Sequence, residues 1–108
     1  MIEYQILVTE RAKRDIEEIA DYIEFSLLNP TASGNFLDDI EDIIISLCSF
    51  PKRHPLANDS ILESWGVRYV NCGSYLVFYL INEETQAVYI LRVLNQRRDW
   101  QVILTKED

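Results

Sequence analysis

The stretch AVYILRVL, residues 87–94, decides the fold of this 108-residue chain. Its β-branched and aromatic side chains, interrupted by one charge at Arg92, are typical of a strand that is buried on both faces. A strand this apolar must lie in the middle of a sheet, and it therefore fixes where the polar segment NQRRDW, residues 95–100, leaves the fold. We expect the function of the protein to reside near that exit.

Two further segments predict strands that pair with this one. Residues 67–71 (VRYVN) and residues 75–81 (YLVFYLI) are rich in β-branched and aromatic side chains. The first turn contains Gly73, and residues 82–86 (NEETQ) lead into the last strand. Short turns of this kind join antiparallel neighbours, so we expect a three-stranded antiparallel meander.

The first half of the chain predicts a short strand, residues 4–8, followed by two amphipathic helices. Thr9 is suited to cap the first helix, and Pro30 to open the second, which we expect to run to about Ser49. Each helix carries an apolar stripe at a spacing of three and four. The stripes are Ala12, Ile16, Ile19, Ala20, Ile23 and Leu27, and Phe36, Ile40, Ile43, Ile44 and Leu47. The short connection makes the two helices an antiparallel hairpin.

These elements predict an α+β fold of order β-α-α-β-β-β, in which the helical hairpin packs on a twisted antiparallel sheet. Residues 1–108 suffice for a single domain with one core. Residues 50–65 contain Pro51 and Pro55 and are expected to form a loop. The tail, residues 105–108, is expected to be frayed.

Composition places the chain among globular proteins, with 48% hydrophobic residues. No apolar stretch approaches the roughly 20 residues of a membrane span. The first residues lack the pattern of a signal peptide, so we expect a cytoplasmic location. Cys48 and Cys72 are too few for a zinc site and are expected to be buried apolar side chains. No cofactor or metal is expected, since the chain has no phosphate-binding glycine loop and no metal-spaced histidine and cysteine set.

The formal net charge of −8 is unevenly distributed. Residues 1–49 hold 3 Lys or Arg and 11 Asp or Glu, whereas residues 50–108 hold 7 of each class. The acidic balance argues against broad nucleic-acid binding by long-range attraction. The carboxylates of the hairpin resemble a metal or acid–base cluster, but adjacent acids on a helix point in different directions and no histidine lies nearby, so we expect a solvated acidic face. The second half remains free to carry a local basic cluster.

The remaining chemistry is that of arginine and aromatic side chains in the sheet or at its exit. These residues are Arg68, Arg92, Arg97, Arg98, Tyr69, Tyr75, Tyr79, Tyr89 and Trp100. Arginines grip phosphates while aromatic rings stack on bases, and the same residue types dominate hot spots of protein recognition. A third interpretation is that Arg98 and Asp99 form a local ion pair and that the aromatic rings belong to the core.

The final block of the sequence, with the order of elements, resembles the RelE/ParE superfamily of toxins from bacterial type II toxin–antitoxin modules. Its most specific part is ILRVLNQRRDW, residues 90–100, since family members often end with such a strand followed by Arg-Arg-Asp. Residues 67–70 and 75–79 also fit, so the resemblance spans nearly the whole chain. It implies a growth-inhibiting protein that a cognate antitoxin neutralises and that meets operator DNA only through that antitoxin.

The resemblance further implies that the antitoxin wraps around the hairpin and the sheet. The residues expected to bind it are Ile16, Ile23, Phe36, Ile40 and Tyr79.

Two activities divide the family. ParE-like members inhibit DNA gyrase, which here implies a target-binding surface. Its residues are Arg92, Arg97, Arg98 and Trp100. RelE-like members are ribosome-dependent messenger-RNA endonucleases. On that alternative the catalytic phosphate ligands are Arg68, Arg97 and Arg98, and a general base is missing. An inactive member that only binds antitoxin is the third interpretation.

Three departures favour the ParE-like interpretation. Leu76 stands where many RelE-like nucleases have an arginine, and Trp100 stands where a tail tyrosine is usual. The acidic composition is also poorly suited to docking on ribosomal RNA. Asn95, however, stands where ParE-like members commonly have a histidine. Whether the chain is an enzyme stays open at this point.

Overall fold

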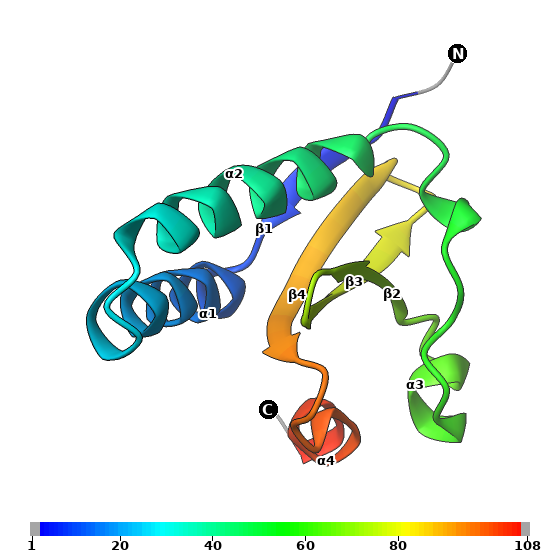
Figure 1. The fold of residues 1–108 in the computed structure, drawn as a ribbon. Helices are drawn as coiled ribbons and strands as arrows, with labels where there is room; N and C mark the ends of the chain where they lie inside the picture. Colours follow the sequence, from blue (N-terminus) through cyan, green and yellow to red (C-terminus); the bar gives the residue numbers. More distant parts are fainter. Residues whose placement is uncertain (1–2, 107–108) are drawn as a thin grey trace.

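A helical hairpin packs across one face of a four-stranded sheet, and two short helices lie against the other face (Figure 1). The structure, a computed structural model, describes residues 3–106. The strands are β1 (Gln5–Val8), β2 (Arg68–Cys72), β3 (Tyr75–Asn82) and β4 (Ala87–Asn95). The helices are α1 (Glu10–Asp21), α2 (Pro30–Ser46), α3 (Ser60–Ser64) and α4 (Trp100–Lys106). The predicted α+β order β-α-α-β-β-β is confirmed, with α3 and α4 as additions.

The strand order of the sheet is β1-β4-β3-β2. The antiparallel meander of β2, β3 and β4 is confirmed. The expectation of a wholly antiparallel sheet is wrong, because β1 pairs with β4 in parallel and the sheet is mixed. Both edges of β3 are occupied within the meander, so the free edge of β4 is where β1 can join the two central strands. Nothing in the short apolar pattern of residues 4–8 indicates the direction of that pairing.

Local capping explains where the hairpin helices begin. The Thr9 hydroxyl accepts a hydrogen bond from the Ala12 N–H at 3.1 Å, which confirms the predicted cap. Pro30 occupies the first turn of α2, as predicted. α1 ends at Asp21 and continues as one wider π-helical turn, Tyr22–Ser26. α2 ends at Ser46, slightly earlier than the predicted Ser49.

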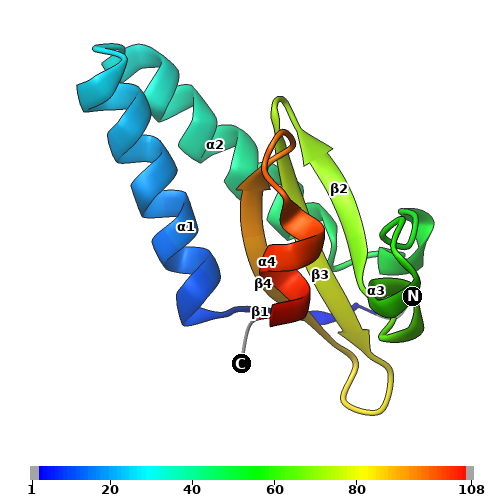
Figure 2. The ribbon, with the colours of Figure 1, turned by 90° about the horizontal axis from the view of Figure 1, so that it is seen from below.

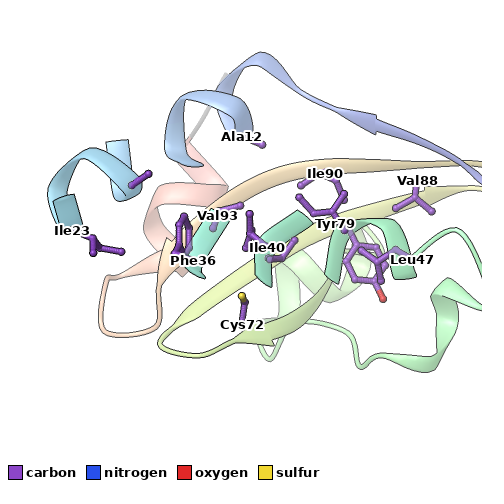
Figure 3. Close-up of a cluster of buried hydrophobic side chains, with 13 residues drawn as sticks. Ala12, Ile23, Phe36, Ile40, Leu47, Cys72, Tyr79, Val88, Ile90 and Val93 are labelled. Carbon is purple, nitrogen blue, oxygen red and sulfur yellow. The ribbon is translucent and has the colours of Figure 1, made fainter. Parts of the chain in front are cut away.

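The hairpin and the sheet enclose the first of two apolar clusters (Figure 3). It comprises Ala12, Ala20, Ile23, Phe36, Ile40, Ile44, Leu47, Cys72, Val77, Tyr79, Val88, Ile90 and Val93. The second cluster lies on the opposite face. It comprises Ala57, Leu62, Val67, Leu76, Phe78 and Leu94, with Trp100, Ile103 and Leu104 packed against them. The two central strands therefore bury both faces, as their continuous apolar runs predicted.

Two segments contain helix where none was predicted. The expected loop at residues 50–65 includes a 3-10 turn, Pro51–Arg53, and the helix α3. The Asp59 carboxylate caps α3 by accepting hydrogen bonds from two backbone N–H groups at 3.1 Å. The predicted frayed tail is wrong for Thr105 and Lys106, which belong to α4. Residues 107–108 lie outside the described residues.

A β-bulge in β4 redirects its side chains. Phe78 pairs with Arg92 and Tyr79 pairs with Ile90, so the residue between Ile90 and Arg92 is extra. As a result Ile90 and Val93, three residues apart, both face the hairpin cluster, which regular alternation does not allow. The bulge lies just beyond the last pair of β1 and β4.

At this bulge the fold contains a buried ion pair. The Arg92 guanidinium donates from Nε to Asp15 Oδ2 at 2.7 Å and from Nη2 to Asp15 Oδ1 at 3.0 Å. The backbone N–H of Val93 donates to the same carboxylate at 3.0 Å. Only 7% of the Asp15 side chain and 5% of the Arg92 side chain are exposed. The carboxylate of α1 thus satisfies a backbone donor of β4 beyond the end of β1 and fixes the hairpin on the sheet.

No helix within residues 3–106 is long and apolar enough to cross a membrane. Both cysteines are free thiols; Cys72 is buried as predicted, whereas Cys48 is half-buried.

Replacing Asp15 by alanine is expected to lower the free energy of unfolding by about 3–5 kcal/mol, because it leaves the Arg92 guanidinium buried without its counter-charge. Urea unfolding of the purified chain measures this loss. Glu17→Ala, on the exposed side of the same helix, is the matched control and is expected to change stability by about 0.5 kcal/mol or less. A loss of less than about 1 kcal/mol in Asp15→Ala contradicts a structural role for the pair.

Candidate functional site

The polar segment after β4 forms a tight turn that we call the arginine turn, residues 95–99. The Asn95 side-chain oxygen accepts a hydrogen bond from the Arg97 N–H at 2.9 Å, and the Asn95 carbonyl accepts one from the Arg98 N–H at 3.0 Å. The Gln96 N–H donates to the Ser74 carbonyl at 2.9 Å, which ties the turn to the end of the β2–β3 connection. Asn95 therefore bends the chain so that Arg97 and Arg98 both point into solvent.

The two arginines of the turn are available for binding. Within residues 3–106 neither guanidinium has an ion-pair partner, and Arg98 and Asp99 do not form the local pair that was one of the interpretations. The surface therefore offers two adjacent unneutralised guanidinium groups. Such groups bind carboxylates or phosphates of a partner.

Trp100, predicted to contact the target, has a structural role in the second apolar cluster. Its ring lies 5.3 Å from that of Phe78, centroid to centroid, and the residue is half-buried. Trp100 is also the first residue of α4, so this contact anchors the helix on the sheet directly after the arginine turn.

Arg92, also predicted to contact the target, is bound to Asp15 inside the fold. Its guanidinium does not share a surface with Arg97 and Arg98. The single charge in the apolar run is thus part of the link between the hairpin and β4.

Arg68 lies at the other end of the meander. It pairs with Tyr79, whereas Asn95 at the arginine turn pairs with Tyr75. At a rise of about 3.3 Å per residue these positions are about 13 Å apart along the sheet. The Arg68 guanidinium donates to the carbonyls of Lys52 at 3.2 Å and His54 at 2.6 Å. The structure therefore does not bring Arg68 together with Arg97 and Arg98.

The predicted antitoxin-binding residues fall into two groups. Ile23, Phe36 and Tyr79 belong to the buried cluster between the hairpin and the sheet (Figure 3). Ile16 and Ile40 line an apolar depression between β1, α1 and α2, which we call the hairpin groove, and Ile40 is at the same time a buried member of that cluster. Its apolar walls are Ile6, Val8, Ile16, Leu37, Ile40, Ile44 and Ile45.

Comparison with known families identifies the chain. Residues 6–100 match the model of the ParE toxin of the type II toxin–antitoxin system parDE. The chain belongs to the ParE toxin family.

Solved structures extend this identification. A structure described as the chromosomal ParDE toxin–antitoxin system from P. aeruginosa shares the fold, with a TM-score of 0.70 and 16% identity over 86% of this chain and 96% of that chain. The RelBE2 toxin–antitoxin complex from Mycobacterium tuberculosis matches with a TM-score of 0.60 and 25% identity over 91% of this chain and 97% of that chain. No curated protein sequence matches. The predicted membership of the RelE/ParE superfamily is confirmed.

Two exposed apolar residues of the hairpin groove in this ParE-family chain, Leu37 and Ile45, were not among the residues predicted to bind the antitoxin. Both lie beside the buried stripe of α2 and follow each other at a spacing of eight, with Glu41 between them. That spacing keeps them on one helical face, which is the signal that an edge of the stripe remains uncovered.

Tyr79 of the ParE-family fold holds the loop after α2 against the sheet. Its hydroxyl donates a hydrogen bond to the Pro51 carbonyl. Burial raises the pKa of this phenol to about 12, although Arg68 and Arg53 act in the opposite direction. The His54 ring packs edge-on against Tyr79, at 6.3 Å between centroids, and burial lowers the pKa of that imidazole, with a further contribution from the Arg53 charge.

The raised pKa of Tyr79 predicts a loss of stability in alkali. The folded protein holds the phenolic proton more tightly than the unfolded chain, whose pKa is near 10. This contribution is complete below pH 10 and is lost as the pH rises from 10 to about 12. Urea unfolding across that window measures it. The pH dependence is expected to be shallower in Tyr79→Phe, and equal slopes in the two proteins contradict the shift.

Proposed function

We propose that this ParE-family chain inhibits bacterial growth by binding DNA gyrase and that a cognate antitoxin neutralises it. The match of the ParE toxin model to residues 6–100 is the observation that carries the proposal. We place the target contact on the arginine turn, where Arg97 and Arg98 are exposed and unpaired within the described residues and directly precede the half-buried Trp100 in the chain. A cytoplasmic location belongs to the same proposal.

The arrangement of the arginines supports binding over catalysis. A ribonuclease needs phosphate ligands that converge on one scissile bond, together with a group that accepts a proton. Arg68 is about 13 Å along the sheet from the turn and is engaged with loop carbonyls. The imidazole of His54 packs on Tyr79 at the Arg68 end of the meander, away from Arg97 and Arg98.

A RelE-like ribosome-dependent messenger-RNA endonuclease is the second candidate function. The similarity to a RelBE2 complex at 25% identity favours it. In that case Arg68, Arg97 and Arg98 serve as phosphate ligands, and the substrate has to span the distance between them.

Induced expression without an antitoxin separates these functions. We expect thymidine incorporation to fall before methionine incorporation, with induction of the DNA-damage response. The double change Arg97→Ala and Arg98→Ala is expected to abolish growth inhibition, whereas Arg68→Ala is expected to retain it. Early loss of protein synthesis with cut messages, together with loss of function in Arg68→Ala, overturns the gyrase proposal. Normal growth with folded protein leaves the inactive, antitoxin-binding interpretation.

We further propose that the antitoxin covers the hairpin groove and binds operator DNA on behalf of the complex. The groove exposes Leu37 and Ile45, whereas most of the surrounding stripe is already buried against the sheet. An amphipathic or extended segment of the antitoxin buries these side chains in the manner of groove recognition.

Changing Leu37 and Ile45 to aspartate is expected to leave growth inhibition intact and to prevent neutralisation by the co-expressed antitoxin. Growth of cells that express both proteins measures this. Ile61→Asp, at an exposed apolar position of α3, is the matched control and is expected to remain neutralised. Full neutralisation of the groove variant excludes this placement of the antitoxin.

A further inference from the structure

The free end of the helical hairpin exposes an apolar cluster that neither the arginine turn nor the hairpin groove includes. We call it the hairpin tip, residues 22–28. Four large side chains are more than half exposed there. They are Tyr22 at 54%, Phe25 at 65%, Leu27 at 55% and Leu28 at 81%. The hairpin projects away from the sheet, so that this cluster stands clear of the body of the fold (Figures 1 and 2). Contiguous apolar exposure of this kind marks an interaction site.

The backbone of the hairpin tip departs from regular α-helix at two places, a π-helical turn and a residue with positive φ. The π-helical turn Tyr22–Ser26 ends α1, and the Asn29 N–H donates to the Ile23 carbonyl at 3.1 Å, which closes the connection. Leu28 has φ of 53°, in the left-handed region where a glycine is usual and a leucine is strained. π-helical turns and strained non-glycine residues both concentrate at functional sites. The strained position thus carries a large exposed apolar side chain.

Charge determines what kind of partner fits the tip. From Ile16 to Pro51 the sequence contains no lysine, arginine or histidine but eight carboxylates. These are Glu17, Glu18, Asp21, Glu24, Asp38, Asp39, Glu41 and Asp42. Nucleic acid and anionic lipid are repelled by this surface, and a second copy brings like charges together. A basic protein segment with apolar side chains is complementary to it.

We propose that the hairpin tip docks a basic, amphipathic segment of the toxin's protein target. The proposal rests on the function argued above, in which the target is a protein. The tip and the arginine turn lie toward the same end of the molecule (Figure 2). Phe36, near the start of α2, packs on Tyr75 with ring centroids 5.2 Å apart, and Tyr75 pairs with Asn95 of the turn. A single target protein can therefore contact both the acidic, apolar hairpin tip and the basic arginine turn.

The tip is distinct from the groove proposed for the antitoxin. The groove is lined by Lys13 and Ile16 of α1, whereas the tip begins at Tyr22. We therefore expect the tip to stay exposed when the antitoxin occupies the groove. Substitutions in the tip should then weaken binding of the target and leave binding of the antitoxin unchanged.

Leu28→Gly is the informative variant, because it removes the most exposed of the four apolar side chains and relieves the strain of a non-glycine residue at positive φ. Its melting temperature is expected to be no lower than that of the natural chain. Combined with Phe25→Ser, it is expected to weaken binding to purified gyrase holoenzyme at least about tenfold and to reduce growth inhibition accordingly. Asp21→Lys is expected to weaken binding as well, since it introduces repulsion against a basic partner. Ile61→Ser, an exposed apolar position of α3, is the matched control and should leave both unchanged.

The outcomes are separable. Growth inhibition lost in a folded tip variant that still binds antitoxin supports the tip, whatever the target is. A natural chain that inhibits growth but binds no gyrase overturns the gyrase proposal alone. Undiminished growth inhibition and gyrase binding in the tip variants overturn the docking proposal. So do two other results: a dimer of the natural chain that Leu28→Gly dissociates, or a loss of antitoxin binding in Leu28→Gly. Absence of growth inhibition in the natural chain overturns both proposals.

Discussion

The carboxylate of Asp15 makes three buried contacts, two with the Arg92 guanidinium and one with the Val93 N–H. These contacts join α1 to β4 at the point where β1 ends and the bulge begins. A bidentate carboxylate–guanidinium pair fixes orientation as well as distance, so it sets the angle at which the hairpin leaves the sheet. The hairpin groove, the projecting tip and the path of β4 to the arginine turn all depend on that angle.

Much of the fold follows from local patterns in the chain. The continuous apolar runs at residues 75–81 and 87–94 predicted the two central strands, and Thr9 and Pro30 predicted where the hairpin helices begin. The parallel direction of β1 was not predictable, because a four-residue strand carries no information about its neighbour. α3 and α4 were missed because helices of 5 and 7 residues are too short to establish a helical period.

The candidate site was predicted less completely, for reasons that particular residues make clear. Arg92 was assigned to a target surface on the resemblance to ParE-like members, and its partner Asp15 lies 77 residues away, beyond the reach of any local pattern. Ile23, Phe36, Ile40 and Tyr79 were assigned to the antitoxin on the resemblance to the toxin family, and the structure buries them in the core. An apolar stripe identifies the face of a helix that packs inward. Leu37 and Ile45, beside that stripe, are the ones left for a partner.

The parallel pairing of β1 with β4 has a consequence for synthesis on the ribosome. Thr9 and Ile90, joined at this seam, are 81 residues apart, and the strand that receives β1 is the last of the sheet to be made. During translation β1 and α1 therefore lack β4, the strand against which they pack, until nearly all of the sheet has been synthesised. A nascent or interrupted chain that stops before residue 95 therefore lacks the complete β4 and its parallel pairing with β1.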